Sequence, residues 1–283
     1  MLSKNYLAIY AKSFNWAGFF LPKKTYDKCS ALYDFCRVAD NIADDENKIE
    51  VKKDNFIKFK NNFVNKNYDD PVIKNMWDLI NEFNISTKIV DDLFEGINSD
   101  IKDRVKFNSK KEILIYSYRV AGTVGLMMAK ILNVSKEQSL KSAIDLGIAM
   151  QLTNISRDVI EDKKNNRSYI NESFEDIETT IKLSEKFYKN SFYSIKEIPL
   201  SFRFSILVAR RVYRKIGYKI LNKKNLENYK KSGKIYVSNI EKIIETLLSI
   251  FDLIKLSLIS KNDDNIEHDH DLIYEEINLN ERI

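Results

Sequence analysis

The sequence predicts an all-α protein with a single core, and three observations support this. Glycine and proline occur only 7 and 3 times in 283 residues, so the turn signals typical of β-rich chains are nearly absent. Apolar residues recur at the three- and four-residue spacing of amphipathic helices. The chain is long enough for one large core, and its length alone does not require a second domain.

Helices are expected between a few clear boundary signals. Pro22 closes an aromatic-rich first segment, and Thr25 to Asp27 offer caps for the helix that follows. Ser86 and Ser238 are further cap candidates, and Pro199 suits a first helical turn. The expected segments are 6–20, a helix at 26–46, a charged helix within 46–71 with a loose connection at 65–70, and helices at 71–83, 86–103, 113–132, 148–162, 175–194, 199–221 and 240–259.

The stretch 151–162 concentrates carboxylate and amide side chains. At about 100° per residue, a helix places them on one arc beside an apolar arc. The polar arc comprises Gln151, Asn154, Asp158, Glu161 and Asp162. Lysine is frequent elsewhere but absent between positions 141 and 163, so these acids lack their usual surface partners. A solvated helix face is the simpler interpretation, whereas the missing lysines favour a site for a hard cation such as Mg²⁺.

A second lysine-free stretch, 29–47, also combines a polar helix face with an apolar one. Its polar face comprises Tyr33, Arg37, Asp40 and Asp44, opposite an apolar face. Each stretch therefore carries Asp-x-x-x-Asp with an arginine nearby. One such pair of acids is common on helices, whereas two in one chain are more specific. We expect the two helices to face each other across a cavity.

Facing carboxylates would hold Mg²⁺ ions that complete their coordination with water and phosphate. Arg37, Arg157 and a downstream lysine would add donors for the same phosphates. This chemistry favours diphosphate as a leaving group, and the carbocation left behind requires a dry, unreactive wall. Aromatic and small residues of 6–20 and 113–132 can supply it. Within 113–132, Gly122 and Gly125 indicate close approach to the backbone by either a neighbouring helix or a long apolar ligand.

Four motifs make the chain similar to the squalene/phytoene synthase family of head-to-head trans-isoprenyl diphosphate synthases. They are Ser13-Phe14 through Leu21-Pro22, Tyr33-Asp34-Phe35-Cys36-Arg37-Val38-Ala39-Asp40, Val120-Ala121-Gly122-Thr123-Val124-Gly125, and Gln151-Leu-Thr-Asn154-Ile-Ser-Arg157-Asp158-Val-Ile-Glu161-Asp162. The resemblance covers almost the whole chain. It implies an isoprenoid (terpenoid) synthase helical bundle over residues 1–260, followed by a polar C-terminal tail at 261–283.

The resemblance also implies roles for individual residues. Asp40, Asp44, Asp158 and Asp162 resemble the Mg²⁺-binding aspartates, with Mn²⁺ as an alternative ion, and Asn154 resembles their supporting amide ligand. Tyr33, Arg37 and Arg157 resemble catalytic, diphosphate-contacting residues. The expected substrate-binding residues are Ser13, Phe14, Tyr116, Val120, Val124, Gln151, Asn154, Lys234 and Tyr236. Lys234 takes the place of the family's C-terminal arginine, so the charge is kept and the bidentate fork is lost.

The activity implied is that of a 15-cis-phytoene synthase in carotenoid biosynthesis. Two geranylgeranyl diphosphates would condense through prephytoene diphosphate, with release of diphosphate and without NADPH. One alternative is a C30 synthase that acts on farnesyl diphosphate and gives dehydrosqualene, squalene or presqualene diphosphate. A non-catalytic assembly factor for respiratory complexes is another, and the retained aspartates and arginines disfavour it.

The remaining features restrict partners and location. A formal charge of +5 is spread along the chain, which favours weak attraction to anions over a nucleic-acid surface. Cys29 and Cys36 match no metal or redox spacing, so reduced thiols and a cytoplasmic location are expected. The apolar run 243–259 is broken by charges, so we expect a packing helix, with peripheral contact to the inner face of the membrane as the alternative.

Overall fold

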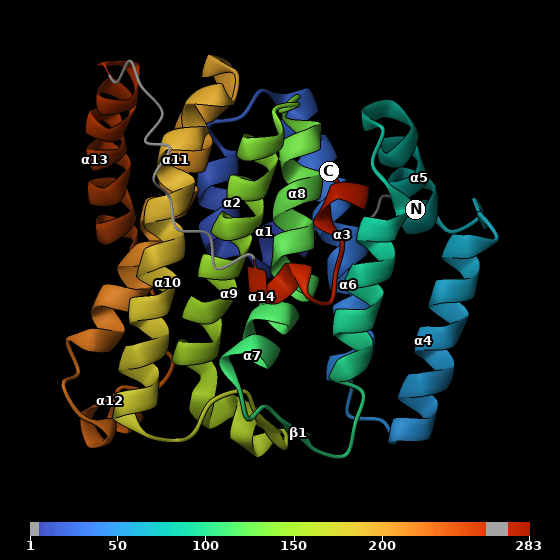
Figure 1. Ribbon diagram of the computed structural model, residues 1–283, viewed down its shortest axis with the longest axis horizontal. Coiled ribbons are helices and arrows are strands. Elements are labelled where there is room, and N and C mark those ends of the chain that lie inside the picture. Colours follow the sequence, from blue (N-terminus) through green and yellow to red (C-terminus); the bar gives the residue numbers. More distant parts are fainter. Residues whose placement is uncertain (1–5, 259–270) are drawn as a thin grey trace.

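Helix α9 (Glu137–Lys164) runs through the middle of the computed structural model, which describes residues 6–258 and 271–283 (Figure 1). Helices α4 and α5 form one edge of the bundle, and α13 forms the opposite edge. The other helices are α1 (Tyr6–Tyr10), α2 (Lys12–Gly18), α3 (Lys23–Asp44), α4 (Ile49–Val64), α5 (Pro71–Phe83), α6 (Thr87–Ser99), α7 (Lys110–Ser117), the π-helical turn η1 (Tyr118–Gly122), α8 (Thr123–Ile131), α10 (Phe174–Ser194), the 3₁₀ turn η2 (Ile195–Glu197), α11 (Leu200–Leu221), α12 (Leu226–Lys231), α13 (Asn239–Leu258), α14 (Asp271–Tyr274) and the 3₁₀ turn η3 (Leu279–Glu281). The expected all-α class is confirmed.

Several helix starts follow capping residues in the sequence. Asp70 accepts from the backbone N–H of Val72, and Ser86 accepts from that of Lys88. Ser238 accepts from the N–H of Glu241, as expected. The expected cap between Thr25 and Asp27 is wrong, because α3 begins at Lys23, directly after Pro22. Proline's restricted φ is compatible with the position just before a helix, so no side-chain cap is needed there.

The expected helix 113–132 is interrupted by the π-helical turn η1 and packs tightly on α9. A Cβ atom on Gly125 would lie 2.3 Å from the carbonyl oxygen of Ala143, and one on Gly147 would lie 2.2 Å from that of Ala121. The glycines of this region therefore allow two helix backbones to touch. A neighbouring helix, and not an apolar ligand, is what approaches the backbone of Gly125.

Within the described residues, two polar connectors form a pair of short β-strands. The sequence did not predict these strands. Strand β1 (Val105–Lys106) lies parallel to β2 (Arg167–Ser168), with Val105 opposite Arg167. The backbone N–H of Val105 donates to Asn166 O, and that of Phe107 donates to Ser168 O. The pairing holds the loop after α9 beside the loop after α6, and so sets the position of Arg167.

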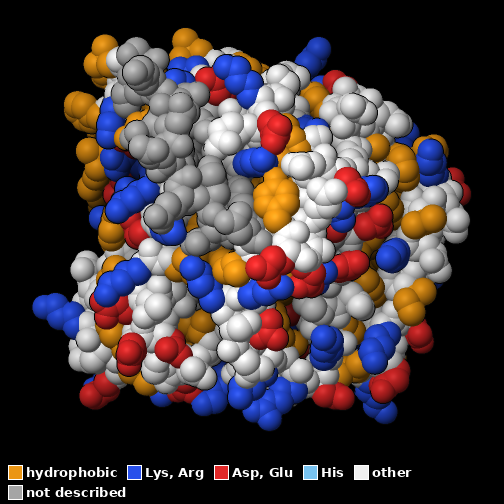
Figure 2. Space-filling view, in the orientation of Figure 1, with side chains coloured by type: hydrophobic (Ala, Val, Ile, Leu, Met, Phe, Trp, Pro, Cys, Tyr) orange, Lys and Arg blue, Asp and Glu red, His pale blue; other side chains and the backbone are white. Residues whose placement is uncertain are grey.

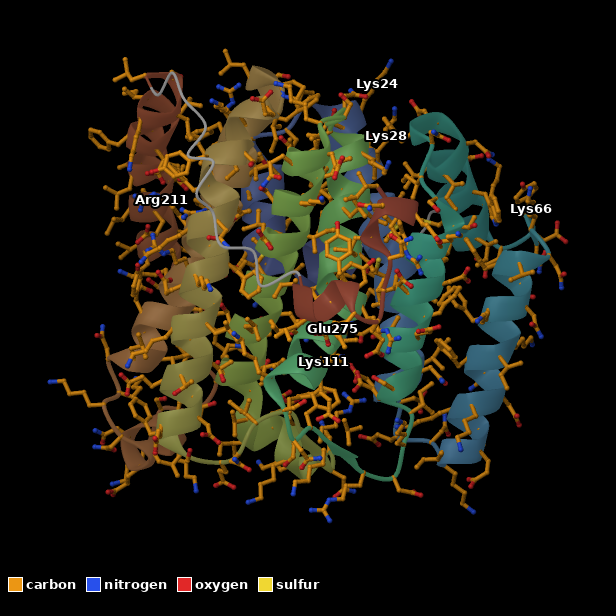
Figure 3. All side chains as sticks on the ribbon, viewed as in Figure 1. Lys24, Lys28, Lys66, Lys111, Arg211 and Glu275 are labelled. Atoms are coloured by element: carbon orange, nitrogen blue, oxygen red, sulfur yellow. The ribbon has the colours of Figure 1, made fainter. Side chains whose placement is uncertain are left out.

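The end of the expected polar tail packs on the bundle. Residues 259–270 lie outside the described part, whereas Ile273 and Leu279 are fully buried. Lys111 Nζ of α7 lies 2.8 Å from Glu275 Oε2, and Figure 3 shows the two side chains side by side. Arg282 binds Asp92 of α6 through Nε at 2.9 Å and Nη2 at 3.0 Å. The last described residues therefore contact α6 and α7.

Replacing Arg282 with alanine is expected to destabilise the protein by about 2 kcal/mol, because among the described residues the buried carboxylate of Asp92 would keep only the hydrogen bond from Tyr118. Urea unfolding followed by circular dichroism measures the loss. The control is Lys88→Ala, which breaks the exposed ion pair with Glu281 in the same segment and should cost less than about 1 kcal/mol. Equal losses in both variants would contradict this assignment.

Among the described residues, no helix is long and apolar enough to cross a bilayer.

Candidate active site

A large cavity is lined by α9 and by helices on both sides of it. Its volume is about 1590 Å³, above the roughly 300–1,000 Å³ of ordinary small-molecule pockets. Every site residue predicted from the sequence lines it. These are Ser13, Phe14, Tyr33, Arg37, Asp40, Asp44, Tyr116, Val120, Val124, Gln151, Asn154, Arg157, Asp158, Asp162, Lys234 and Tyr236.

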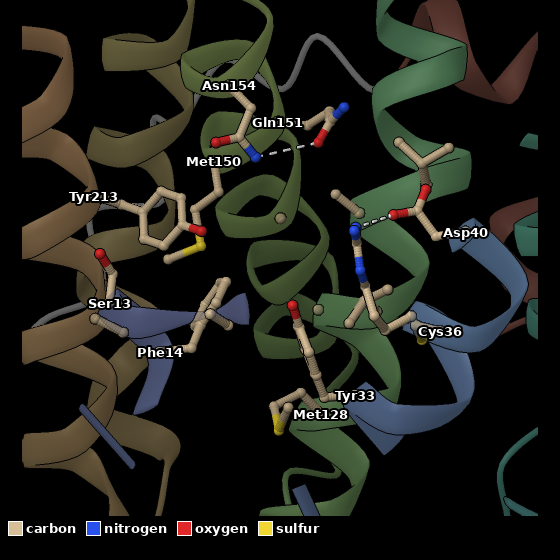
Figure 4. Close-up of a pocket in the computed structure, with 18 of the residues that line it drawn as sticks. Ser13, Phe14, Tyr33, Cys36, Asp40, Met128, Met150, Gln151, Asn154 and Tyr213 are labelled. Atoms are coloured by element: carbon tan, nitrogen blue, oxygen red, sulfur yellow. Dashed lines mark hydrogen bonds and ion pairs between the residues drawn. The ribbon is translucent and has the colours of Figure 1, made fainter. Parts of the chain in front are cut away.

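The first acidic motif lies on the cavity face of α3. That helix buries Leu32, Phe35 and Ala39 in the core, which turns its polar face toward the cavity. Arg37 Nη1 donates to Asp40 Oδ2 at 2.6 Å, the contact drawn in Figure 4. It also lies 3.9 Å from Asp44 Oδ2. Burial, with the negative charge of Asp44, raises the pKa of Asp40 to about 6.

The second acidic motif projects from α9, with basic groups placed among its carboxylates. Arg157 donates to both oxygens of Asp158, at 2.8 and 2.5 Å. Lys234 Nζ lies 3.6 Å from Asp158 Oδ1 and 2.5 Å from Glu161 Oε2. Burial, with the charge of Asp158, raises the pKa of Asp162 to about 7. Lys234 thus contacts this motif, although a lysine-rich connector separates the two in sequence.

Arg167 of β2 lies between the two motifs. Its Nη1 donates to Asp44 Oδ1 at 2.8 Å, and its Nη2 donates to the carbonyl of Ala43 at 3.2 Å. Its positive charge also opposes the upward pKa shifts of both Asp40 and Asp162. Because one guanidinium interacts with carboxylates of both helices, the two acidic faces converge on the same region of the cavity.

A buried carboxylate and two stacked tyrosines lie next to β2 and interact with one another. The hydroxyls of Tyr116 and Tyr169 each donate to Asp100 at 2.7 Å, and their rings stack with centroids 4.8 Å apart. Burial raises the pKa of Asp100, whereas the Arg167 charge opposes the shift. Asp100 directly follows α6. It lines the cavity.

The wall away from the carboxylates is largely apolar. The rings of Phe14 and Tyr213 lie 4.7 Å apart, and Figure 4 shows them across the cavity from Tyr33 and Asp40. Met150 lies near Tyr213 and Met128 lies near Tyr33, so flexible thioethers line both sides of the cavity. The faces of the aromatic rings can stabilise a positively charged carbon.

Several cavity residues were not singled out as site residues by the sequence analysis. They are Lys12, Asp100, Tyr169, Tyr213 and Lys242, together with Arg167. Only the pattern Arg167-Ser-Tyr169, directly after the second motif, offered a sequence signal. Lys242 is buried, and its ammonium lies 5.9 Å from the ring of Trp16. Burial, with the nearby charge of Lys12, lowers the pKa of Lys242.

The donor set of the two motifs suits a hard divalent cation. Across residues 6–258 and 271–283, no three His, Cys, Asp or Glu side chains are already gathered as a metal site. Asp40, Asp158 and Asp44 are instead paired with Arg37, Arg157 and Arg167, respectively. However, Asn154 Oδ1 is buried with no hydrogen-bond partner in the described structure, and Figure 4 shows this amide at the cavity. All the available donors are oxygens, the ligands that Mg²⁺ prefers.

Comparison with known proteins agrees with this geometry. The squalene/phytoene synthase family model matches residues 7–176. A 15-cis-phytoene synthase from Pantoea ananas is 27% identical over 247 residues, which cover 76% of this chain and 80% of the relative. A phytoene synthase from Cereibacter sphaeroides is 29% identical over 74% of this chain and 68% of its own.

Solved structures show the same fold. A ligand-bound dehydrosqualene synthase superposes with a TM-score of 0.70 and 24% identity, over 88% of this chain and 94% of that one. A squalene synthase from Alicyclobacillus acidocaldarius gives 0.64 and 16% identity, over 77% and 89%. The fold and the family match define an all-α prenyltransferase. The chain belongs to the squalene/phytoene synthase family.

Proposed function

We propose that this protein is a 15-cis-phytoene synthase that joins two geranylgeranyl diphosphates head to head through prephytoene diphosphate. The observation that carries the proposal is the convergence of two Asp-x-x-x-Asp faces, with Arg167 between them, on one large cavity. A site rich in carboxylates and guanidinium groups suits metal-bound diphosphate, and the adjoining apolar wall suits a prenyl chain. The similarity to phytoene synthases over three quarters of the chain supports the C20 substrate.

In this proposal the cationic side chains exchange partners when substrate binds. Arg37 and Arg157 now neutralise Asp40 and Asp158. With cations on the carboxylates, both guanidinium groups become free to donate to diphosphate oxygens. Lys234, next to Asp158, would donate a third contact in place of an arginine fork. Tyr33 lies one helical turn before Arg37 and would orient the same diphosphate.

The divalent ion, Mg²⁺ or alternatively Mn²⁺, would be held by Asp40, Asp44, Asn154, Asp158 and Asp162. When bound, it would neutralise the charge that develops on diphosphate as the C–O bond breaks. The buried, unbonded Asn154 Oδ1 and the mutually repelling carboxylates support this assignment.

The apolar part of the cavity would hold the prenyl chains away from water. Phe14, Val120 and Val124 line the cavity, together with Ser13, Tyr116, Gln151 and Tyr236. Excluding water protects a carbocation from capture as an alcohol. A volume of about 1590 Å³ favours two long chains over one. A C30 synthase that uses farnesyl diphosphate is the alternative, and the dehydrosqualene synthase fold is compatible with it.

Product analysis tests the proposal. Purified protein with Mg²⁺ is expected to convert radiolabelled geranylgeranyl diphosphate to phytoene, with no requirement for NADPH. Parallel reactions contain farnesyl diphosphate, with and without NADPH, and the hydrocarbons are identified by mass spectrometry. A C30 product formed in preference to C40 would establish the alternative. Turnover of neither diphosphate would favour a non-catalytic assembly role. A cytoplasmic location remains a prediction.

A further inference from the structure

Helix α13 exposes a continuous apolar face at one edge of the bundle. Figure 2 shows hydrophobic side chains along the edge where Figure 1 places this helix. The exposed residues are Ile240, Ile243, Ile244, Leu247, Ile250, Phe251, Ile254 and Leu258, each with 43% to 78% of its surface accessible. We call this set the α13 apolar face.

The same helix turns its polar side inward, the reverse of a helix on a water-exposed surface. Glu241 pairs with Lys219 at 2.7 Å. Arg211, labelled in Figure 3, pairs with Glu245 at 3.0 Å and with Asp252 at 2.7 Å. Ser249 is fully buried. Ion pairs and hydrogen bonds thus attach α13 to α11, while the aliphatic residues that would normally form a core face outward.

The charge distribution around the face matches a lipid surface. Every carboxylate of α13 is drawn inward by a basic residue of α11, so the apolar face carries no anionic group. Its exposed charged residue is Lys255, and the whole chain has a formal charge of +5. An aliphatic face with cationic and no anionic charge is typical of helices that lie in the membrane interface.

A second copy of the chain fits this face less well. Cores of protein interfaces are enriched in Tyr, Trp, Phe, Met and Arg. The α13 apolar face contains only Phe251 from that group, and its other members are isoleucine and leucine. It is also a convex helix surface of about 30 Å, the length of 20 residues. Such a surface can sink among acyl chains without a complementary groove.

We propose that the α13 apolar face docks the protein on a lipid bilayer, with the helix lying along the membrane surface. The helix begins beside the cavity, where Asn239 and Lys242 line the wall. If the proposed function holds, the site consumes prenyl diphosphates and makes a hydrocarbon without any polar group. Substrate and product both have long apolar chains that partition into a bilayer. This link to the reaction rests on the proposed function, whereas the docking itself rests on α13 alone.

Vesicle flotation without any prenyl diphosphate tests the docking. The vesicles are phosphatidylcholine alone and an equimolar mixture with phosphatidylglycerol. Wild-type protein is expected to float with both, and more completely with the anionic mixture. The double variant Leu247→Gln/Phe251→Gln replaces two side chains that are 56% and 65% exposed, and its vesicle partition coefficient should fall by about tenfold or more.

The matched control is Ile57→Gln/Val64→Gln on α4, at the opposite edge of the bundle, where the side chains are 56% and 58% exposed. It should float like wild type, and both variants should keep the wild-type circular dichroism spectrum. Three results would overturn the proposal. They are no flotation of the wild type, equal flotation of the two double variants, and a wild-type dimer in light scattering that Leu247→Gln/Phe251→Gln dissociates. Since no substrate is present, failure of the product assay leaves this result unaffected.

Discussion

Asp158→Asn is expected to lower kcat/KM for geranylgeranyl diphosphate by at least about 100-fold, because it removes a charged oxygen ligand aimed at the reacting diphosphate. The side chain of Asp158 is only 15% exposed and is held by Arg157 and Lys234. Asparagine has the same shape and can still accept from Arg157, so the fold should survive. The measurement is consumption of labelled substrate at several Mg²⁺ concentrations, alongside circular dichroism.

The control is Glu161→Gln, one turn further along α9. It removes the same charge from the same region, but the Glu161 side chain is 55% exposed and is paired with Lys234. We expect a loss of less than about tenfold, because screened charges act weakly. A rise in the Mg²⁺ concentration needed for half-maximal rate should accompany Asp158→Asn alone. A variant that consumes substrate at the wild-type rate would refute the metal-binding role, and equal losses in both variants would indicate a general effect of charge.

The helices that carry the two motifs were predictable because their pattern is local. Asp40 and Asp44, like Asp158 and Asp162, are four residues apart, so helical geometry alone puts each pair on one face. The absence of lysine around them separated these faces from ordinary solvated ones. That the two faces share one cavity required tertiary structure: Arg167 donates to Asp44 on the first face, and its charge opposes the upward pKa shift of Asp162 on the second.

Residues that reach the site through tertiary pairing could not be read from the sequence. Arg167 is positioned by a two-residue strand opposite Val105, a pairing too short to leave a periodic signal. Asp100 becomes important because Tyr116 and Tyr169 bring their hydroxyls to it from distant segments. Such roles depend on which loops meet, and the composition of polar connectors does not specify this.

Helix α13 shows a second limit of periodicity. The run 243–259 predicted a packing helix, with membrane contact as the alternative, and an apolar stripe was expected to face inward. In the structure, Glu245 and Asp252 face inward because Arg211 of α11 offers them a buried ion-pair partner. A hydrophobic pattern predicts which residues share the apolar face of a helix and which share the polar face. It does not predict which of the two faces packs against the rest of the protein.

Gly147→Ala is expected to destabilise the protein by about 3 kcal/mol or more, the second large effect. Alanine normally stabilises a helix interior by about 1 kcal/mol relative to glycine. Here the new Cβ would lie 2.2 Å from Ala121 O and 2.9 Å from Gly122 Cα. These are backbone atoms, so no side chain can rotate away, and α9 must separate from η1.

Thermal unfolding measures this cost, as a fall of about 5–10 °C in the midpoint. The control is Gly217→Ala in α11, where the nearest atom to a new Cβ is Ile181 Cγ2 at 3.4 Å, an ordinary contact. The same substitution should there be neutral or stabilising by up to about 1 kcal/mol. If Gly147→Ala lowers the stability and Gly217→Ala does not, the loss of stability comes from the backbone contact between η1 and α9. That contact also positions Val120 and Gln151 at the cavity, so Gly147→Ala should lose activity even below its unfolding temperature. If the variant were as stable as the wild type, the contact would be refuted.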